Sequence, residues 1–223
     1  LFIVLRDPLL SKALKELVEL TPYSRDEFEL AFEKVKTSDF LEAARRMMVR
    51  HAMGVSVDRR IKPDQTVCKT GFRDFTGKAR SAPVRDWISY PDQIKSWTQR
   101  LAGVIIKSDE ATKTMARHDR ADALHYVDPP YIMSERRSGR RGYAHDMVDG
   151  DHVQLLEFLK TLKGMVVLSG YPNELYDHLL PDWTRVTTET TDLVNSQRTE
   201  CLWLSPSAVA AKARQKRQGD LFA

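Results

Sequence analysis

Residues 126–131 read Tyr-Val-Asp-Pro-Pro-Tyr, and this stretch decides how the rest of the chain is interpreted. The residues just before the prolines, 123–127, are mostly apolar and partly β-branched or aromatic, which predicts a buried strand. Two prolines then prevent both further strand pairing and entry into a helix, so the strand must end there. In an open α/β sheet the carboxyl ends of the strands are where ligands bind.

The predicted strand end brings three groups together: the carboxylate of Asp128, the carbonyl of Pro129 held by the turn, and the ring of Tyr131. This set suits a flat ring that carries an exocyclic amino group. The carboxylate and the carbonyl would accept its two N–H bonds, and the tyrosine would stack on its face. The alternative is a plain strand-ending turn with a capping aspartate. Tyrosines on both sides and an apolar strand in front favour the binding site.

These residues resemble the Dam-like adenine-specific DNA methyltransferases, bacterial and phage enzymes whose catalytic motif is Asp-Pro-Pro-Tyr. The resemblance runs from the first residue to about Pro206, with similar stretches at residues 1–23, 142–152, 166–171 and 198–203. It implies S-adenosyl-L-methionine as methyl donor, and a flipped adenine in double-stranded DNA as substrate. It also implies a catalytic motif formed by Asp128, Pro129, Pro130 and Tyr131. Asp128 and Asp109 would lie near the cofactor, although Asp109 could equally be a helix cap.

One part of the family pattern is missing. Dam-like enzymes open with a lysine-containing segment and a Phe-x-Gly-x-Gly loop that surround the methionine end of the cofactor. Here the chain starts at Leu1, where the following helix is expected, and its ten glycines include no Gly-x-Gly. We therefore expect the amino-terminal cofactor-binding part to be absent, and these 223 residues alone to bind S-adenosylmethionine weakly or not at all.

Composition favours a soluble protein of the reduced cytoplasm, and the resemblance to DNA methyltransferases implies that it is associated with the nucleoid. With 42% hydrophobic and 30% charged residues, the chain can bury one good core with a subdomain attached. It has no apolar run of membrane-spanning length. Cys68 and Cys201 are far apart and the six histidines are scattered, so we predict no metal site.

The positive charge is concentrated in two segments. Residues 55–86 hold eight Lys/Arg against four Asp, and the stretch after the proline motif adds Arg136, Arg137, Arg140 and Arg141. Basic loops beside a base-binding motif are typical of a surface that follows DNA phosphates, whereas either loop alone would be an ordinary solvated loop. We predict that the four arginines bind DNA.

The first hundred residues read as helices. Asp7 and Pro8 predict the start of a first helix, Ser24 with Glu27 a capping box for a second, and Ser38 the cap of a third that ends at Gly54. Met47, Met48 and His51 on the third helix are expected in the core. Residues 55–90 form a long loop, and Pro91 opens another helix.

From Gly103 the pattern alternates between strands and helices. Strands are predicted at residues 104–106, 123–127 and 165–169, with a final antiparallel pair at 183–191 and 199–204. Asp149 and Asp151 would cap the helix that carries His152. This predicts the carboxyl part of a Rossmann-like methyltransferase core. The expected domains are a remnant of the amino-terminal core at 1–21, a helical target-recognition insertion at 22–100, the catalytic α/β core at 101–206, and a frayed basic tail at 207–223.

Two secondary sites remain open. Ser169, Gly170 and Tyr171 end the next strand and would line the base or methionine pocket, or form an ordinary turn. Arg198 would face phosphate or make a structural ion pair.

Other functions share parts of this pattern. Related Asn-Pro-Pro-Tyr enzymes methylate RNA or protein glutamine, and some Asp-Pro-Pro-Tyr enzymes modify ribosomal RNA. A non-catalytic DNA-binding remnant is a further alternative, and a plain nucleotide-binding module is disfavoured because no phosphate loop is present. The helical insertion and the basic loops favour site-specific methylation of adenine in duplex DNA.

Overall fold

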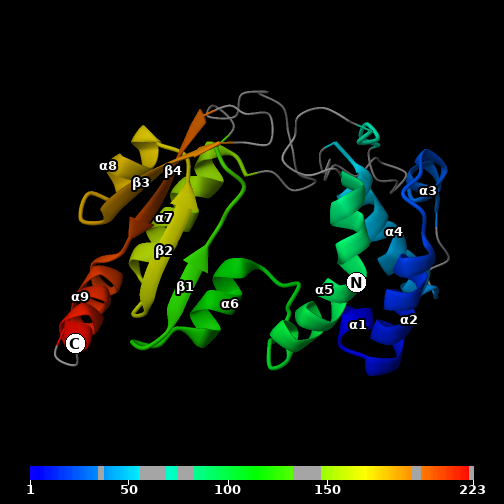
Figure 1. Ribbon diagram of the computed structural model, residues 1–223. Coiled ribbons are helices and arrows are strands. Elements are labelled where there is room, and N and C mark those ends of the chain that lie inside the picture. The colour runs from blue at the N-terminus through cyan, green and yellow to red at the C-terminus, as the bar shows by residue number, and fades with distance from the viewer. Residues whose placement is uncertain (35–37, 56–68, 75–82, 133–146, 192–196, 221–223) are drawn as a thin grey trace. The chain divides into compact units, whose positions relative to one another are not determined.

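The computed structural model describes residues 1–34, 38–55, 69–74, 83–132, 147–191 and 197–220. They divide into two compact units, one spanning Leu1–Ile106 and the other beginning at Lys107 (Figure 1). The first is helical, and the second contains the sheet. Within the described ranges, no helix is both long and apolar enough to cross a bilayer.

The helical unit contains five helices among its described residues: α1 (Phe2–Leu5), α2 (Pro8–Leu20), α3 (Arg25–Leu30), α4 (Phe40–Met53) and α5 (Pro83–Leu101). The predicted start of α2 is confirmed, because Asp7 Oδ1 accepts from the backbone N–H groups of Leu9 (2.9 Å) and Leu10 (3.0 Å). Helices α2, α4 and α5 pack against one another around a core of buried side chains that includes Leu14, Val18, Phe28, Met53 and Ile94.

Helix α5 begins earlier than the sequence predicts. Pro91 lies inside it, and the helix starts at Pro83. Pro91 cannot donate a hydrogen bond to the preceding turn, but Trp87 in that turn is buried and its Nε1–H donates to the Thr21 carbonyl (2.8 Å). Burial of this indole explains why the helix continues through the proline.

The capping residue of α3 agrees with the prediction, whereas that of α4 differs from it. Ser24 Oγ accepts from the N–H of Glu27 as predicted (3.2 Å), but α4 is capped by Asp39 rather than Ser38, since Asp39 Oδ1 accepts from Glu42 N (2.9 Å). With α4 in this register Met48 is buried, whereas Met47 and His51 face solvent. Their assignment to the core was therefore wrong.

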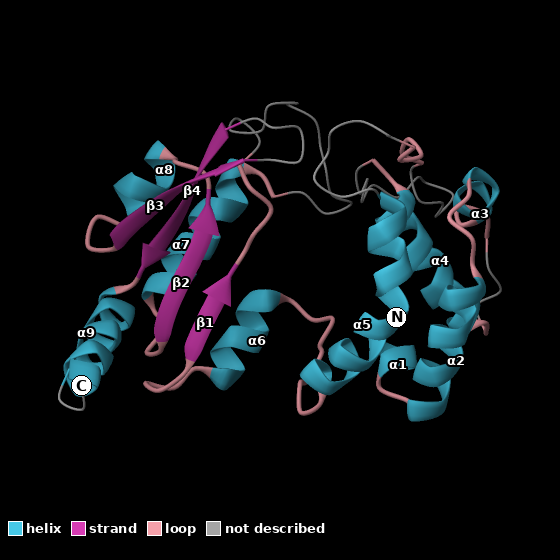
Figure 2. Cartoon of the chain, in the orientation of Figure 1, coloured by secondary structure: helices cyan, strands magenta, loops and turns pink. Residues whose placement is uncertain are grey.

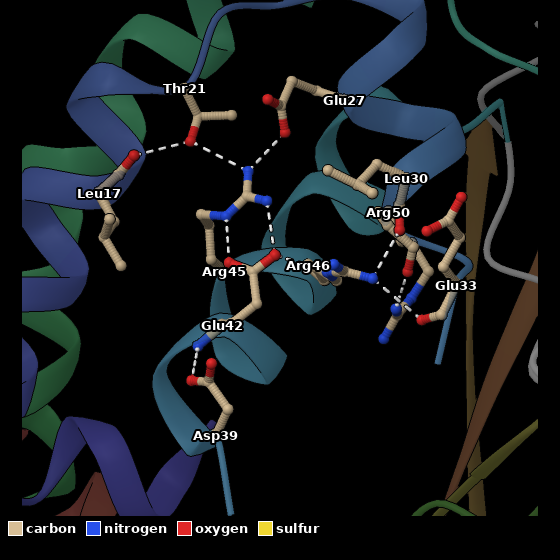
Figure 3. Close-up of polar contacts among 11 residues, drawn as sticks. Leu17, Thr21, Glu27, Leu30, Glu33, Asp39, Glu42, Arg45, Arg46 and Arg50 are labelled. Atoms are coloured by element: carbon tan, nitrogen blue, oxygen red, sulfur yellow. Dashed lines mark hydrogen bonds and ion pairs between the residues drawn. The ribbon is translucent and has the colours of Figure 1, made fainter. Parts of the chain in front are cut away.

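A buried arginine ties α2, α3 and α4 together (Figure 3). The guanidinium of Arg45 donates to Glu42 through two nitrogens (2.6 and 2.7 Å) and to Glu27 (2.6 Å). It also donates to Thr21 Oγ1 (3.2 Å), which in turn donates to the Leu17 carbonyl (2.7 Å). The side chain of Arg45 is only 9% exposed, so losing either carboxylate would leave this buried charge only partly compensated.

We expect the stability of α4 to fall at acid pH because of Glu42. Hydrogen bonds from Arg45 lower the pKa of Glu42 from its ordinary 4.5 to about 2. A carboxylate with a depressed folded-state pKa stabilises the protein above pH 4.5, and that contribution is lost as the pH falls toward 2. Amide hydrogen exchange in α4 should show a loss on the order of 2–3 kcal/mol across this window.

Two variants identify the source of that loss. Glu42→Gln should be less stable at pH 7 and should remove most of the pH dependence. Glu19→Gln is the matched control, since Glu19 pairs with Lys15 at 3.6 Å on the surface and its side chain is 48% exposed. If the stability of Glu42→Gln still fell as the pH was lowered from 4.5 toward 2, another carboxylate would be responsible.

The predicted long loop is closed at its base. Gly54 and Phe72 form an antiparallel bridge, with Val55 N donating to the Gly71 carbonyl (2.8 Å) and Arg73 N to the Met53 carbonyl (2.7 Å). The ring of Phe72 lies 5.4 Å from that of Tyr23 and 5.6 Å from that of Phe28. Residues 69–74 are thereby anchored to the helical core. Residues 56–68 and 75–82 lie outside the described ranges.

The second unit is built on a four-stranded sheet (Figure 2). Its strands are β1 (Leu124–Val127), β2 (Met165–Gly170), β3 (Thr184–Thr191) and β4 (Gln197–Leu204), in the spatial order β1-β2-β4-β3. β1 and β2 are parallel, and β4 is antiparallel to both β2 and β3. The predicted final antiparallel pair is confirmed. Its helices are α6 (Ala111–His118), α7 (Asp149–Lys160), α8 (Glu174–Leu179) and α9 (Pro206–Asp220).

The core of this unit lies between the sheet and helices α7 and α8. Leu155, Leu156 and Leu159 of α7 are buried together with Leu168 of β2 and Trp203 of β4. Asp151 caps α7 by accepting from Val148 N (2.9 Å), while Asp149 is its first helical residue. The buried face of α7 is thus formed by leucines three and four positions apart, as is typical of an amphipathic helix.

Two expected elements differ in the structure. Val104, Ile105 and Ile106 form no strand and are 45%, 77% and 49% exposed. They lie where the chain passes from one unit to the other, and β propensity makes a strand only where a partner strand and a core are present. The tail is not frayed from residue 207, because α9 packs on β2 with Ala208 buried and Ser205 Oγ accepting from Ala208 N (3.3 Å).

The turn before β2 requires glycine at position 164. Asp119 accepts from Lys163 N (2.8 Å) and Gly164 N (2.9 Å), and these bonds lower its pKa. A Cβ at Gly164 would lie 2.9 Å from the carbonyl oxygens of both Ala123 and Arg120, which are backbone atoms and cannot rotate away. We expect Gly164→Ala to cost about 1–3 kcal/mol in urea unfolding.

Gly150→Ala is the control for this prediction. Gly150 lies in the first turn of α7, where a Cβ would meet no atom within 4 Å. Alanine is the better helix former, so this variant should be neutral or slightly more stable. Equal unfolding midpoints for the two variants would contradict the steric argument.

Candidate active site

The structure brings the ends of β1 and β2 together. The two strands are parallel, and Val127 lies opposite Leu168. The residues that follow, Asp128 and Ser169, therefore stand side by side at one edge of the sheet. β1 ends at Val127, immediately before the motif, as the two prolines predict.

Asp128 is held by the neighbouring strand. Its side chain is exposed, and its Oδ1 accepts a hydrogen bond from Ser169 Oγ (2.8 Å). The same hydroxyl lies 3.2 Å from the Val127 carbonyl. Ser169 is itself only 5% exposed, so this contact connects the core to the exposed carboxylate.

The proline turn is anchored on both sides. Pro129 is buried, Pro130 is half-buried, and Ile132 beyond the motif is 5% exposed within the core of the unit. Within the described ranges every peptide bond is trans. Asp128 and Tyr131 thus project from a turn whose apolar residues are packed.

Tyr131 faces a second tyrosine. Its ring centroid lies 4.5 Å from that of Tyr171, with an angle of 72° between the planes, which is an edge-to-face contact. Burial, and then the charge of Asp128, raise the pKa of Tyr131 to about 12. The phenol therefore stays neutral at physiological pH, and its ring presents an uncharged surface next to the carboxylate.

A buried polar layer supports the end of β2. His152 Nδ1 and the Tyr176 hydroxyl are 2.8 Å apart, and burial raises the pKa of Tyr176. The Tyr176 ring packs edge-to-face on Trp203 (5.0 Å), whose Nε1–H donates to Asp177 Oδ1 (2.9 Å). A Cβ on Gly170 would lie 3.3 Å from the Trp203 ring, so a larger residue would displace this strand end.

A cavity of about 480 Å³ lies next to the turn. Ile132 and Pro172, the residues that directly follow the two tyrosines, belong to its wall. The rest of the lining is mostly polar: Asp149, Asn173, Glu174, Leu175, Asp177 and Arg185. Asp177 and Arg185 form an ion pair, which partly neutralises the acidic wall.

The structure unites some of the predicted residues and leaves others apart. Asp128 and Tyr131 contact Ser169 and Tyr171 at the end of β2. That these residues line a base or methionine pocket stays a prediction. Asp109 is exposed in the coil before α6, whose cap position is Glu110. Its assignment to the cofactor stays a prediction.

The residues predicted to bind DNA fall outside this description. Arg136, Arg137, Arg140 and Arg141 lie outside the described residues, as does the side chain of Arg198. Among the side chains that the structure describes, no group of three or more His, Cys, Asp or Glu could hold a metal ion.

Sequence reasoning missed the specific contact between Ser169 and Asp128. A serine near the end of a buried strand is a weak signal by itself. The register of β1 against β2 is what places it beside the motif. Both strands were predicted, but neither their parallel pairing nor the residues that stand opposite each other could be.

Comparison with known proteins identifies the family. Residues 65–199 match the family model of the D12 class N6 adenine-specific DNA methyltransferases, and this range contains the proline motif, β1, β2 and the whole of α7. A search of curated proteins found no match. The matched range covers more than half of the chain and includes the aspartate and tyrosine assembled at the sheet edge, so the chain belongs to the D12 class of N6 adenine-specific DNA methyltransferases.

Proposed function

We propose that the end of β1 binds the amino group of a flipped adenine and orients it for methyl transfer. The observation that carries this proposal is the Asp128 carboxylate, exposed at the sheet edge, held by Ser169 and adjoining the Tyr131–Tyr171 pair. A carboxylate beside an aromatic surface can both accept an amino N–H and bind the face of a purine.

The residues of the turn have distinct roles in this proposal. Asp128 Oδ2 and the Pro129 carbonyl oxygen accept the two N–H bonds of the adenine amino group. These acceptors draw the nitrogen away from planarity, so its lone pair is less delocalised into the ring and becomes more nucleophilic. Tyr131 stacks on the base and holds it over the turn.

S-adenosylmethionine, when bound, would supply an electrophilic methyl group that leaves its sulfur for the adenine nitrogen. The exposed negative charge of Asp128 suits a ligand with a positive sulfonium and ammonium group. Asp128 does not need to be a strong base, because the amino proton becomes acidic only as nitrogen acquires positive charge. The proton then leaves through the carboxylate to solvent.

We infer that the sheet is the carboxyl part of a Rossmann-like core. The order β1-β2-β4-β3, with β4 as the antiparallel strand, supports this interpretation. Residues 101–206 would then be the catalytic part, and residues 22–100 the target-recognition part that reads duplex DNA. An enzyme that methylates chromosomal DNA would be located in the cytoplasm, at the nucleoid.

The function is tested by expressing the full-length gene in cells that lack adenine methylation. Sequencing that detects N6-methyladenine should reveal methylation at one short recognition sequence. The same cells expressing Asp128→Ala should show none. Methylation confined to RNA in the wild-type cells would overturn the choice of DNA as substrate.

Substitutions in the basic loop after the motif are expected to affect DNA binding. Charge reversal of Arg136, Arg137, Arg140 and Arg141 should weaken binding to all DNA sequences alike, because these residues follow the catalytic turn closely enough to reach phosphates beside the extruded base. Changes within residues 56–68 and 75–82 should instead alter which sequence is methylated, because the segment between α4 and α5 is long enough to enter a groove.

Binding and methylation across a randomised-site library at two salt concentrations separate these effects. Each lost phosphate contact should flatten the log–log salt dependence by about one unit. An arginine variant with altered sequence preference but an unchanged salt slope would reverse the two assignments.

A further inference from the structure

We propose that Ser169 is a positioning residue that sets the orientation of the Asp128 carboxylate for methyl transfer. This inference rests on the function proposed above for Asp128. In this proposal a buried residue of the neighbouring strand affects the reaction through Asp128 and does not contact the substrate.

The hydroxyl of Ser169 has one proton and two acceptors within reach. The Asp128 carboxylate oxygen is at 2.8 Å and the Val127 carbonyl oxygen is at 3.2 Å. Neither acceptor can donate, so the single proton must come from the serine. The shorter distance and the negative charge favour the carboxylate, because hydrogen bonds to a charged acceptor are the stronger ones.

The geometry leaves one carboxylate oxygen for the substrate. Oδ1 is engaged by Ser169, and among the described residues no donor meets Oδ2. A carboxyl group held by one oxygen retains little freedom to rotate, so the direction of Oδ2 is set before the base arrives. Asp128 is otherwise exposed, and without this bond it would exchange between rotamers.

Ser169 is well placed to hold Asp128 because it is itself held. It is 5% exposed within β2, where its backbone pairs with Leu202 of the antiparallel strand β4. The preceding residue, Leu168, is fully buried, and the following residue, Gly170, packs under the Trp203 ring. The packed core of the sheet therefore fixes the position of the Ser169 hydroxyl. Through its hydrogen bond, this hydroxyl restricts the motion of the exposed Asp128 side chain.

The test compares Ser169→Ala with a second buried serine in the full-length enzyme. Ser205 is also 5% exposed and also bonds β2, through Val166 N (2.9 Å), but at the opposite end of that strand from the motif. Methyl transfer to unmethylated plasmid DNA, dissociation constants for S-adenosylmethionine and for DNA, and unfolding midpoints are measured for both variants.

Ser169→Ala should lower kcat by on the order of 10- to 100-fold and leave both dissociation constants nearly unchanged, because a misplaced catalytic group affects the reaction more than binding. Ser205→Ala should lower the unfolding midpoint at least as much while keeping the wild-type kcat. A merely structural role for Ser169 would make the two variants alike, and that result would overturn the proposal.

Two further substitutions keep the test decisive if the alanine variant folds poorly. Ser169→Thr retains the hydroxyl and should recover most of the lost kcat, whereas Ser169→Cys, with a weak donor of similar size, should remain impaired. Equal activity of the threonine and cysteine variants would show that the donated hydrogen bond is irrelevant.

Asp128→Ala separates this inference from the proposed function. Loss of turnover in Asp128→Ala with wild-type kcat in Ser169→Ala would refute only the positioning role. Normal turnover in Asp128→Ala would refute the proposed site itself.

Discussion

Asp128→Ala is expected to reduce kcat by on the order of 100- to 1,000-fold in the full-length enzyme, with the fold intact. The substitution removes one of the two acceptors proposed to orient the amino group, and the loss of a single preorganised polar contact in an active site typically costs 10²–10³-fold. The fold should tolerate the change, because Asp128 is exposed and its hydrogen bond in the described structure is the one from Ser169. Tritium transfer to unmethylated plasmid DNA measures the loss.

Asp122→Ala is the matched control. Asp122 precedes β1, is 74% exposed and pairs with Arg120 at 3.0 Å on the surface. It has the same charge and a similar position in the chain, but no place at the sheet edge. Both variants should show wild-type unfolding curves, and only Asp128→Ala should lose turnover. A well-folded Asp128→Ala enzyme with wild-type kcat is incompatible with the assigned site.

The catalytic turn was predictable because its signal is local. Two consecutive prolines end a strand whatever surrounds them, so the position of Asp128 at the end of β1 follows from six residues. The capping of α2 by Asp7 and the buried leucines of α7 are local in the same sense. Each depends on residues within a few positions of one another, and the rest of the fold cannot easily override them.

The misassigned elements depended on distant residues. Pro91 begins a helix by local rules, but burial of Trp87 against the carbonyl of Thr21, 66 positions away, extends α5 back to Pro83. Residues 104–106 have strand propensity but no partner strand in the described structure. The bond between Ser169 and Asp128 likewise spans 41 positions and required the strand register. Local propensity carries no information about such contacts.

Tyr131→Ala is expected to weaken DNA methylation far more than Tyr131→Phe or Tyr131→Trp. Stacking of a base on an aromatic ring contributes about 1–3 kcal/mol, equivalent to roughly 5- to 150-fold in binding, and it requires a flat face but not a hydroxyl. The edge-to-face contact with Tyr171 would hold a phenylalanine ring in the same orientation. Wild type, Tyr131→Phe and Tyr131→Trp should therefore have similar dissociation constants and kcat with unmethylated DNA, whereas Tyr131→Ala should have a higher dissociation constant and a lower kcat.

Tyr126→Ala controls for the loss of any tyrosine near the motif, since Tyr126 is 64% exposed on β1 and precedes the turn. It should retain most of the activity. Equal losses in Tyr131→Phe and Tyr131→Ala would show that the hydroxyl, and not the ring, is what the reaction needs.

The pH profile provides an independent check on the role of the ring. With a pKa of about 12, the Tyr131 phenol is neutral throughout the range in which the enzyme can be assayed, so its ionisation cannot affect turnover there. Wild type and Tyr131→Phe should therefore have the same profile between pH 6 and about 10. A wild-type activity that changes near pH 10, with no such change in Tyr131→Phe, would mean that the phenol ionises at the site. In that case its proton, and not only its flat face, would take part in the reaction.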